Sequence, residues 1–196
     1  MNTLIRLIAV AVLTVVPAMA GAATWQIDPA HANIEFRVRH LMVAWVKGTF
    51  PGVSGTVEID ETDLAKSKVE VTIDTATINT NHDKRDEHLR SADFFDVANH
   101  PTMTFVSKKI AAEGDTVKQI TGDLTIRGTT REVTLKVNEL TPAITDPWGN
   151  QRRGAMATAE INRKDFGLTW NKLLETGGVA VGDEVRIALD VELIRK

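Results

Sequence analysis

The chain has 196 residues, a formal net charge of −3 and no cysteine. The negative balance argues against nucleic acid or an anionic lipid surface as the main partner, and the lack of cysteine excludes disulfides and lipid attachment through a thiol. This length is enough for one domain with a sizeable apolar core, and that core must stabilise the fold alone.

The N-terminal residues have the features of a cleavable secretory signal. Arg6 precedes an apolar run at residues 7–16, and small residues at 18, 20 and 22 form cleavage patterns. The run covers about ten residues, whereas a transmembrane helix needs about 20, and a retained membrane anchor is the alternative. We therefore expect residues 1–22 to be removed, export to the periplasm, and a single domain over residues 23–196.

Apolar and polar residues alternate along most of the remaining chain, which is typical of strands with one buried and one wet face. Such strands favour an antiparallel sheet, because parallel sheets bury both faces. Turn-forming residues separate the stretches at 65–68, 113–115, 127–130 and 146–150. The alternating stretches are residues 34–38, 53–59, 69–73, 124–126, 133–137 and 185–193.

A series of one-faced strands must close on itself or stack on a second sheet, because open edges promote aggregation. The last predicted strand, residues 184–194, would be roughly 35 Å long at about 3.3 Å per residue. Such a length favours a tall barrel over a compact sandwich. The sequence therefore predicts an all-β, antiparallel barrel of about eight strands with a short helical insertion.

Two segments are candidates for helix. Residues 40–44 could form one turn that leads to Trp45, and residues 82–90 form a clearer helix with Asn81 or Thr80 as its N-cap. Only Leu89 is strongly apolar in the second segment. We therefore expect interactions other than core burial to hold that helix in place.

Aromatic residues follow the predicted helix. In an extended chain Phe94 and Phe95 would point to opposite sides, one into the barrel and one onto the helix or a partner. Phe50, Phe166 and Trp170 have the same ambiguity between core and ligand contact. Trp148 occupies a turn, where it either covers a barrel end or lies on the surface.

An ordered set of motifs resembles the YceI-like family of bacterial periplasmic proteins, and it covers nearly the whole chain after the leader. One position varies within the family's usual range, since Ala32 follows the first histidine of the set. The matching segments are Trp25-x-Ile27-Asp28 with His31, Phe36-x-x-x-His40, Gly48-Thr49-Phe50, residues 80–105, Gly122-Asp123-Leu124-Thr125-Ile126-x-Gly128 and Arg163-x-Asp165-Phe166-Gly167.

The resemblance implies a lipocalin-like barrel that is open at one end and holds an extended lipid tail, such as a polyisoprenoid, in an apolar pore. It also makes a homodimer plausible, and it implies no catalytic residues. A solid packed core is the alternative, because periodicity does not separate a pore from a core. The predicted ligand-lining residues are Ile34, Phe36, Val38, Val71, Ile73, Phe94, Phe105, Leu124, Ile126, Leu135, Phe166 and Leu189.

The polar helix is a candidate for the end of the pore that meets a lipid head group. Arg85, with His88 or His40 nearby, could meet a phosphate or an amide through charge-assisted hydrogen bonds. The alternative is that Arg85 and Asp86 pair with polar groups of the barrel wall and fix the helix in place. Both interpretations stay open at the level of sequence.

Two other classes of function compete with lipid binding. A metal-dependent hydrolase lacks support, because His82 and His88 are six residues apart and no HExxH, HxH or GxSxG pattern occurs. A partner-binding module with a solid core is the other rival. We expect a binding or carrier protein, not an enzyme, with no cofactor, no metal and no stable membrane insertion.

Overall fold

The computed structural model describes residues 21–175 and 177–196. The expected signal peptide, residues 1–22, falls almost entirely outside them. In chain order the elements are β1 (Ala23–His40), β2 (Ala44–Thr49), β3 (Val53–Ile59), η1 (Leu64–Lys66), β4 (Lys68–Asp74), η2 (Thr75–Thr77), α1 (Asp83–Arg90), β5 (Thr102–Glu113), β6 (Thr116–Ile126), β7 (Thr129–Leu140), β8 (Ile144–Thr145), β9 (Gln151–Asn162), η3 (Arg163–Phe166) and β10 (Val181–Arg195).

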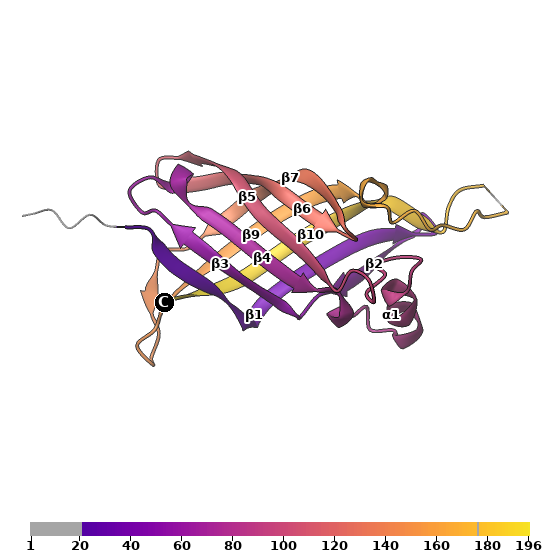
Figure 1. The fold of residues 1–196 in the computed structure, drawn as a ribbon, viewed down its shortest axis with the longest axis horizontal. Helices are drawn as coiled ribbons and strands as arrows, with labels where there is room; N and C mark the ends of the chain where they lie inside the picture. The colour runs from indigo at the N-terminus through magenta and orange to yellow at the C-terminus, as the bar shows by residue number, and fades with distance from the viewer. Residues whose placement is uncertain (1–20, 176) are drawn as a thin grey trace, which may run out of the picture.

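The strands form a closed antiparallel barrel, elongated in the view of Figure 1. Eight strands close it in the order β10-β1-β3-β4-β5-β6-β7-β9, and β9 pairs back with β10. The two short strands lie outside this ring, since β2 pairs with β1 and β8 with β9. The predicted all-β, lipocalin-like barrel of about eight strands with one helical insertion is confirmed.

Alternation along the strands decides which side chains point inward. In β4 the apolar residues Val69, Val71 and Ile73 are half-buried, whereas their neighbours on both sides are exposed. Strand β1 is 18 residues long, and it bends where its register with β10 shifts between Ile27 and Ala32. This bend lets the first part of β1 pair with β3 and the second part with β2.

The hairpin connection predicted at residues 127–130 is present, whereas the helical turn expected at residues 40–44 is not. Arg127 and Gly128 form a two-residue connection between β6 and β7, both with positive φ, as hairpins of this type require. The single helical turn expected at 40–44 is absent, because residues 41–43 form a hairpin turn between β1 and β2. There Leu41 and Met42 have φ values of 51° and 60°, which a right-handed helix excludes.

The most deeply buried large apolar side chains include Trp25, Ile78, Phe166 and Leu193, each at most 2% exposed. They belong to a core that extends along the barrel wall and under η2 and η3. Within residues 21–175 and 177–196, no helix combines the length and the hydrophobicity that crossing a membrane requires.

Candidate functional site

The barrel encloses a cavity of about 280 Å³, measured as the space open to the centre of a water molecule. Thirty-seven of its forty lining residues are apolar, and the other three are Glu35, Ser67 and Arg163. Its lining includes Leu64 of η1 and Leu89 of α1. The barrel is therefore not a solid core along its whole length, and its interior offers almost no hydrogen bonds to an occupant.

Twelve of the fifteen residues predicted to contact a ligand line this cavity. Inward alternation on β1, β4, β5, β6, β7 and β10 brings ten of them together from distant parts of the sequence, and the other two, Phe94 and Phe166, come from the turn after α1 and from η3. The twelve are Ile34, Phe36, Val38, Val71, Ile73, Phe94, Phe105, Leu124, Ile126, Leu135, Phe166 and Leu189.

The remaining three predicted residues, His40, Arg85 and His88, do not line the cavity. His40 is exposed at the end of β1. The Arg85 guanidinium donates to the hydroxyl of Thr80 (2.7 Å) and to its carbonyl oxygen (2.9 Å). These bonds favour the alternative in which Arg85 fixes the helix in place.

His88 lies one layer outside the cavity. Its Nε2 is 2.8 Å from an Asp93 carboxylate oxygen, and its ring packs edge-on against Phe94 and Trp170, with centroids 5.1 and 4.9 Å away. Because Phe94 lines the cavity, a change at His88 would reach the cavity wall through one aromatic contact.

Hydrogen bonds to the preceding segment hold α1 in place. Asp86 is 5% exposed, and its carboxylate accepts from both the backbone N–H and the hydroxyl of Thr80. At the other end of the helix the Arg90 guanidinium donates to the carbonyl oxygens of Ala76 and Ile78, each at 2.8 Å. The expectation that something other than core burial holds the helix agrees with these contacts.

The expected N-cap of this helix was wrong. The cap is His82, whose side chain accepts from the backbone N–H of Arg85 at 3.3 Å. Asn81 has φ of 59°, and Thr80 is already bonded to Asp86. The chain therefore reaches helical geometry later than the usual capping preferences indicate.

Phe94 and Phe95 both line the cavity, and Phe94 also packs against His88 of α1, whereas we expected one ring in the barrel and the other on the helix or a partner. That expectation assumed an extended chain, whereas the segment is a turn in which the Phe95 N–H donates to the Leu89 carbonyl oxygen. Phe95 packs edge-on against Phe50, with centroids 5.6 Å apart. The two rings and Leu89 form an apolar flap, residues 89–95, over one end of the barrel.

Two charged residues that the sequence analysis did not place at the cavity line it, Glu35 and Arg163, and Arg163 is only 4% exposed. Its guanidinium donates to the carbonyl oxygens of Gly182, Leu168 and Trp170, and to a carboxylate oxygen of Asp183. Burial lowers the pKa of Arg163. Because these acceptors belong to the protein, Arg163 joins η3 to β10 and leaves little donor capacity for a ligand.

Sequence reasoning also missed the contribution of β9. Ala155, Met156 and Ala157 line the cavity, but the alternation in that strand is carried by alanines, which give a weak hydrophobic signal. The small side chains lie beside large ones on the neighbouring strand β10, since Ala157 pairs with Leu189 and Ala155 with Val191. This pairing leaves open space inside the barrel.

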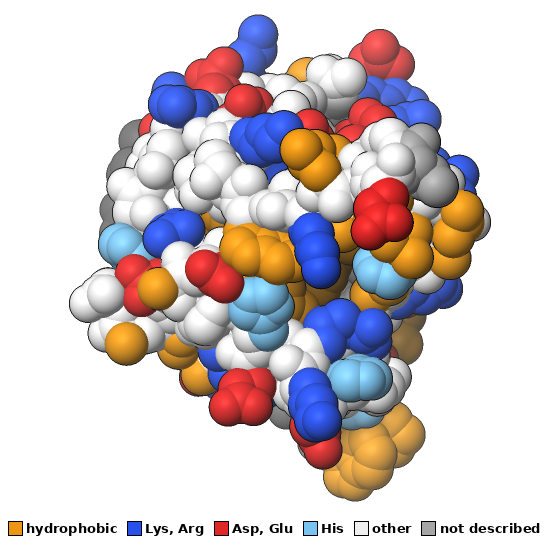
Figure 2. All heavy atoms as spheres, turned by 90° about the vertical axis from the view of Figure 1, so that its right-hand side faces the viewer, with side chains coloured by type: hydrophobic (Ala, Val, Ile, Leu, Met, Phe, Trp, Pro, Cys, Tyr) orange, Lys and Arg blue, Asp and Glu red, His pale blue; other side chains and the backbone are white. Residues whose placement is uncertain are grey.

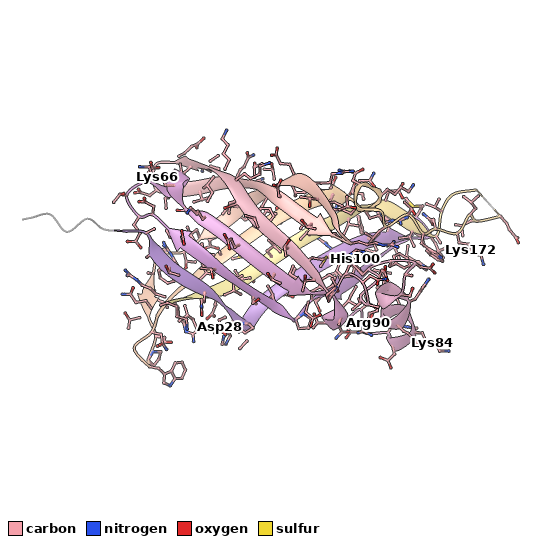
Figure 3. All side chains as sticks on the ribbon, in the orientation of Figure 1. Asp28, Lys66, Lys84, Arg90, His100 and Lys172 are labelled. Carbon is pink, nitrogen blue, oxygen red and sulfur yellow. The ribbon has the colours of Figure 1, made fainter. Side chains whose placement is uncertain are left out.

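The end of the barrel near α1 carries a surface recess. Figure 2 shows hydrophobic side chains at its floor, surrounded by Lys, Arg and His side chains. Figure 3 places Lys84, Arg90 and Lys172 at this end and Asp28 in the other half of the molecule. The polar groups near α1 therefore surround the apolar opening and do not line the cavity.

Ion pairs connect several strands in the opposite half. The Arg152 guanidinium donates to carboxylate oxygens of Asp28 (2.7 Å), Asp146 (2.8 Å) and Glu192 (2.9 Å). Arg152 and His31 lower the pKa of Asp28 to about 2, and Arg152 likewise lowers the pKa of Asp146. We call these five residues the Arg152 network.

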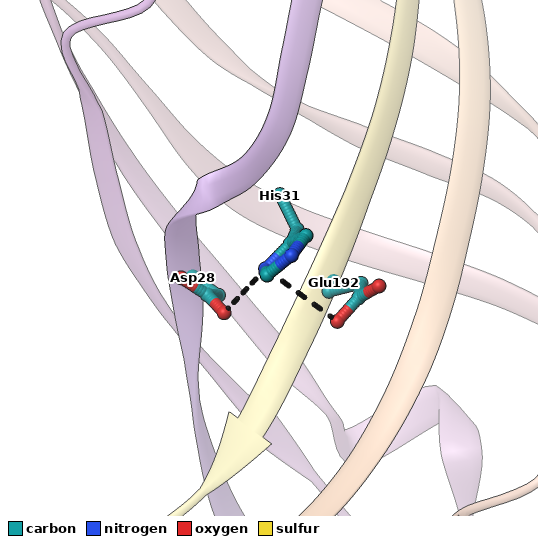
Figure 4. Close-up of side chains that lie close together, drawn as sticks. All are labelled: Asp28, His31 and Glu192. Atoms are coloured by element: carbon teal, nitrogen blue, oxygen red, sulfur yellow. Dashed lines mark hydrogen bonds and ion pairs between the residues drawn. The ribbon is translucent and has the colours of Figure 1, made fainter.

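Part of this network also has the composition of a metal site. Among the described residues, Asp28, His31 and Glu192 place three ligand atoms within 4.8 Å of one another (Figure 4). The oxygens that face His31 are the same ones to which Arg152 donates. A cation would therefore have to displace a guanidinium, and the geometry fits a structural ion-pair network better.

Comparison with known proteins agrees with this architecture. The family model described as the YceI-like domain matches residues 25–193. The chain belongs to the YceI-like family. It is 42% identical over 179 residues to a UPF0312 protein of Pseudomonas aeruginosa, covering 90% of each chain. It is 45% identical over 151 residues to Protein YceI of Escherichia coli, covering 76% of this chain and 78% of the relative.

Solved structures show the same fold. BcnA of Burkholderia cenocepacia superposes with a TM-score of 0.72 at 25% identity, covering 85% of this chain and 98% of that one. The YCEI protein of Campylobacter jejuni superposes with a TM-score of 0.64 at 28% identity, covering 81% and 90%. Membership of the YceI-like family therefore rests on both sequence and fold.

Proposed function

We propose that this YceI-like protein is a periplasmic carrier that holds the tail of a long-chain isoprenoid, or of a related amphiphilic lipid, in the barrel cavity. The observation that carries the proposal is the enclosed cavity with its almost wholly apolar lining. We assign ligand contact to the twelve predicted residues that line it. The proposed role is binding, because the lining offers an occupant apolar contact and almost no polar groups.

The chemistry of the lining suits an alkyl or isoprenoid chain. Each methylene moved from water into such a site contributes about 0.8 kcal/mol, and an apolar chain leaves no donor or acceptor unpaired. A polar ligand would lose hydrogen bonds to water that Glu35, Ser67 and Arg163 replace only in part. Binding strength should therefore increase with chain length until the cavity is filled.

A structural neighbour supports the class of ligand. The polyisoprenoid binding domain from Saccharophagus degradans superposes with a TM-score of 0.65, covering 89% of this chain and 99% of that one. It is only 15% identical, so its ligand reaches this protein by analogy of fold. The feature of this chain on which the analogy depends is the cavity inside its barrel.

The head group should lie at the α1 end, where Lys, Arg and His side chains surround the recess (Figure 2). His88 is the candidate contact there, because it lies against Phe94 of the cavity wall. Arg85 is a weaker candidate, since Thr80 already accepts from its Nε and Nη2. The apolar flap would cover the ligand below its head group.

Extraction of the purified protein with organic solvent, followed by mass spectrometry, tests the proposal. We expect a long-chain lipid in a near one-to-one ratio with protein. Consistent absence of any such lipid, from protein purified without detergent, would contradict the proposal.

A pair of substitutions on β6 locates the ligand. Leu124→Glu puts a charge into the cavity and should remove the lipid, because burying an unpaired carboxylate beside an alkyl chain is costly. Thr125→Glu puts the same charge on the outer face beside Thr130 and should keep it. Equal lipid content in the two variants, with both shown to be folded by circular dichroism, would place the ligand elsewhere.

A further inference from the structure

The hairpin between β1 and β2 ends in three apolar residues that are exposed to solvent. Leu41 is 39% exposed, Met42 53% and Val43 77%. Leu173 in the next loop is 81% exposed, and the Leu41 N–H donates to the Ala180 carbonyl oxygen of that loop at 2.8 Å. We call residues 41–43 the hairpin tip.

The backbone of the hairpin tip is also unfavourable for these residue types. Leu41 and Met42 have φ of 51° and 60°, a conformation that Asn and Gly adopt in hairpins and that bulky side chains avoid. The tip therefore breaks two local rules at once, one of turn chemistry and one of hydrophobic exposure. A position that combines strain with exposed apolar surface is a candidate for function.

A tryptophan and several basic side chains lie behind the apolar hairpin tip, as in proteins that contact a membrane interface. The guanidinium carbons of Arg39 and Arg186 lie 4.4 and 4.8 Å from the centroid of the Trp45 ring. Tryptophan and basic side chains occupy the head-group region of bilayers, with apolar residues deeper. Residues 35–48 contain three basic side chains against one acidic one, Glu35, although the whole chain has a net charge of −3.

The tip directly continues the wall of the cavity. Val38 and Val181 line the cavity, and His40, next to the tip, pairs with Val181. Figure 1 shows β2 and α1 at the same end of the barrel. A surface that holds the tip would therefore also face the opening of the cavity.

We propose that the hairpin tip docks the protein on the surface of an anionic lipid bilayer, so that the cavity exchanges its lipid with that membrane. This inference rests on the proposed carrier function. Three apolar residues are far too few to span a membrane, so the contact is peripheral and reversible. The overall negative charge does not prevent it, because electrostatic attraction to lipid acts within about 10 Å and depends on the charge near the surface.

Sedimentation with vesicles tests the docking. The probes are vesicles of phosphatidylglycerol and phosphatidylcholine in equal parts, and vesicles of phosphatidylcholine alone. We expect binding to the first kind, weakened by salt, and much less binding to the second.

Variants of the tip separate docking from folding. Leu41→Asn with Met42→Gly supplies the residues that the turn prefers, so the melting temperature should stay equal or rise while vesicle binding falls by about tenfold or more. Val43→Ser should act in the same direction, and Lys47→Gln should weaken binding by about fivefold. Trp148→Ser is the matched control, because Trp148 is 82% exposed on the loop held by the Arg152 network and should not affect binding.

Unchanged vesicle binding in the tip variants would overturn the inference. So would a change in sedimentation from dimer to monomer without a change in vesicle binding, since the tip would then contact a second copy of the chain. Lipid extracted from the same preparations distinguishes the two proposals. Bound lipid without docking contradicts only the docking, whereas docking without bound lipid contradicts the carrier function.

Discussion

The two halves of the barrel are stabilised by different interactions. Near α1 the closing residues are apolar, with Leu89, Phe94 and Phe95 over the cavity. In the opposite half, Arg152 connects three carboxylates from separate segments by direct ion pairs. Apolar contacts are non-directional and can be remade by a lipid tail, whereas the ion pairs have fixed partners. If the proposed carrier function is correct, we therefore expect a ligand to enter past the apolar flap at the α1 end.

Filling the cavity should give the largest effect, and it should act on ligand length. Ala157→Trp on β9 places a large ring in the space beside Leu189. Displacing about four methylenes, at about 0.8 kcal/mol each, should weaken binding of a long chain by about 200-fold, while short chains bind nearly as before. Competition between fluorescent lipids of different lengths measures this.

The neighbouring residue supplies the control for that substitution. Thr158 is exposed and bonds to Asn138 on the outer face, so Thr158→Trp should leave the length preference unchanged. If Ala157→Trp weakened the binding of short and long lipid chains equally, the depth of the cavity would not determine the preference for chain length.

Releasing the α1 end should give a smaller effect. Thr80→Val removes the hydroxyl that donates to the buried Asp86 carboxylate and accepts from Arg85. An unsatisfied buried group costs about 1–3 kcal/mol. Because this cost destabilises α1, we expect faster hydrogen exchange in α1 and faster lipid release. Thr134→Val, at an exposed hydroxyl pair on β7, is the control. Slower exchange in the whole barrel, or no change in α1, would contradict the role of Thr80.

The strands of the barrel could be predicted from the sequence, because their pattern depends only on whether each residue and its immediate neighbours are apolar or polar. A residue such as Val71 points inward whenever its neighbours are polar and the strand has period two, so no knowledge of distant residues is required. The same reasoning failed in β9, where alanines weaken the contrast. It did not apply at Phe94 and Phe95, because the backbone there forms a turn and is not extended.

The Arg152 network lay beyond sequence reasoning for another reason. Arg152 and Asp28 are 124 residues apart, and each is an ordinary charged residue in its own segment. Only the pairing of β1, β9 and β10 brings them together. The hydrogen-bond partner of Arg85 could not be predicted for a similar reason, because its bonds to Thr80 depend on the exact path of the chain before α1.

Removing Arg152 should affect stability and leave the cavity nearly unchanged. Arg152→Met keeps much of the side-chain bulk but leaves Asp28, Asp146 and Glu192 without their shared cation. We expect the melting temperature at neutral pH to fall by several degrees, with lipid affinity within about twofold of the parent. A loss of lipid affinity as large as that of Ala157→Trp would show that the Arg152 network and the cavity are coupled, and it would contradict a purely structural role for Arg152.

The pH dependence of the same variant tests the electrostatic cause. In the folded protein Arg152 and His31 hold the pKa of Asp28 at about 2, below its ordinary value of 3.8. The ionised carboxylate therefore contributes its full stabilisation above about pH 4, and this contribution is lost as the pH falls towards 2. In Arg152→Met the pKa of Asp28 should return towards 3.8, so the free energy of unfolding should vary less between pH 4 and 2. Urea denaturation at several pH values, with the difference between parent and variant as the readout, measures it. A constant difference across that range would mean that Arg152 stabilises the barrel by packing and not by charge.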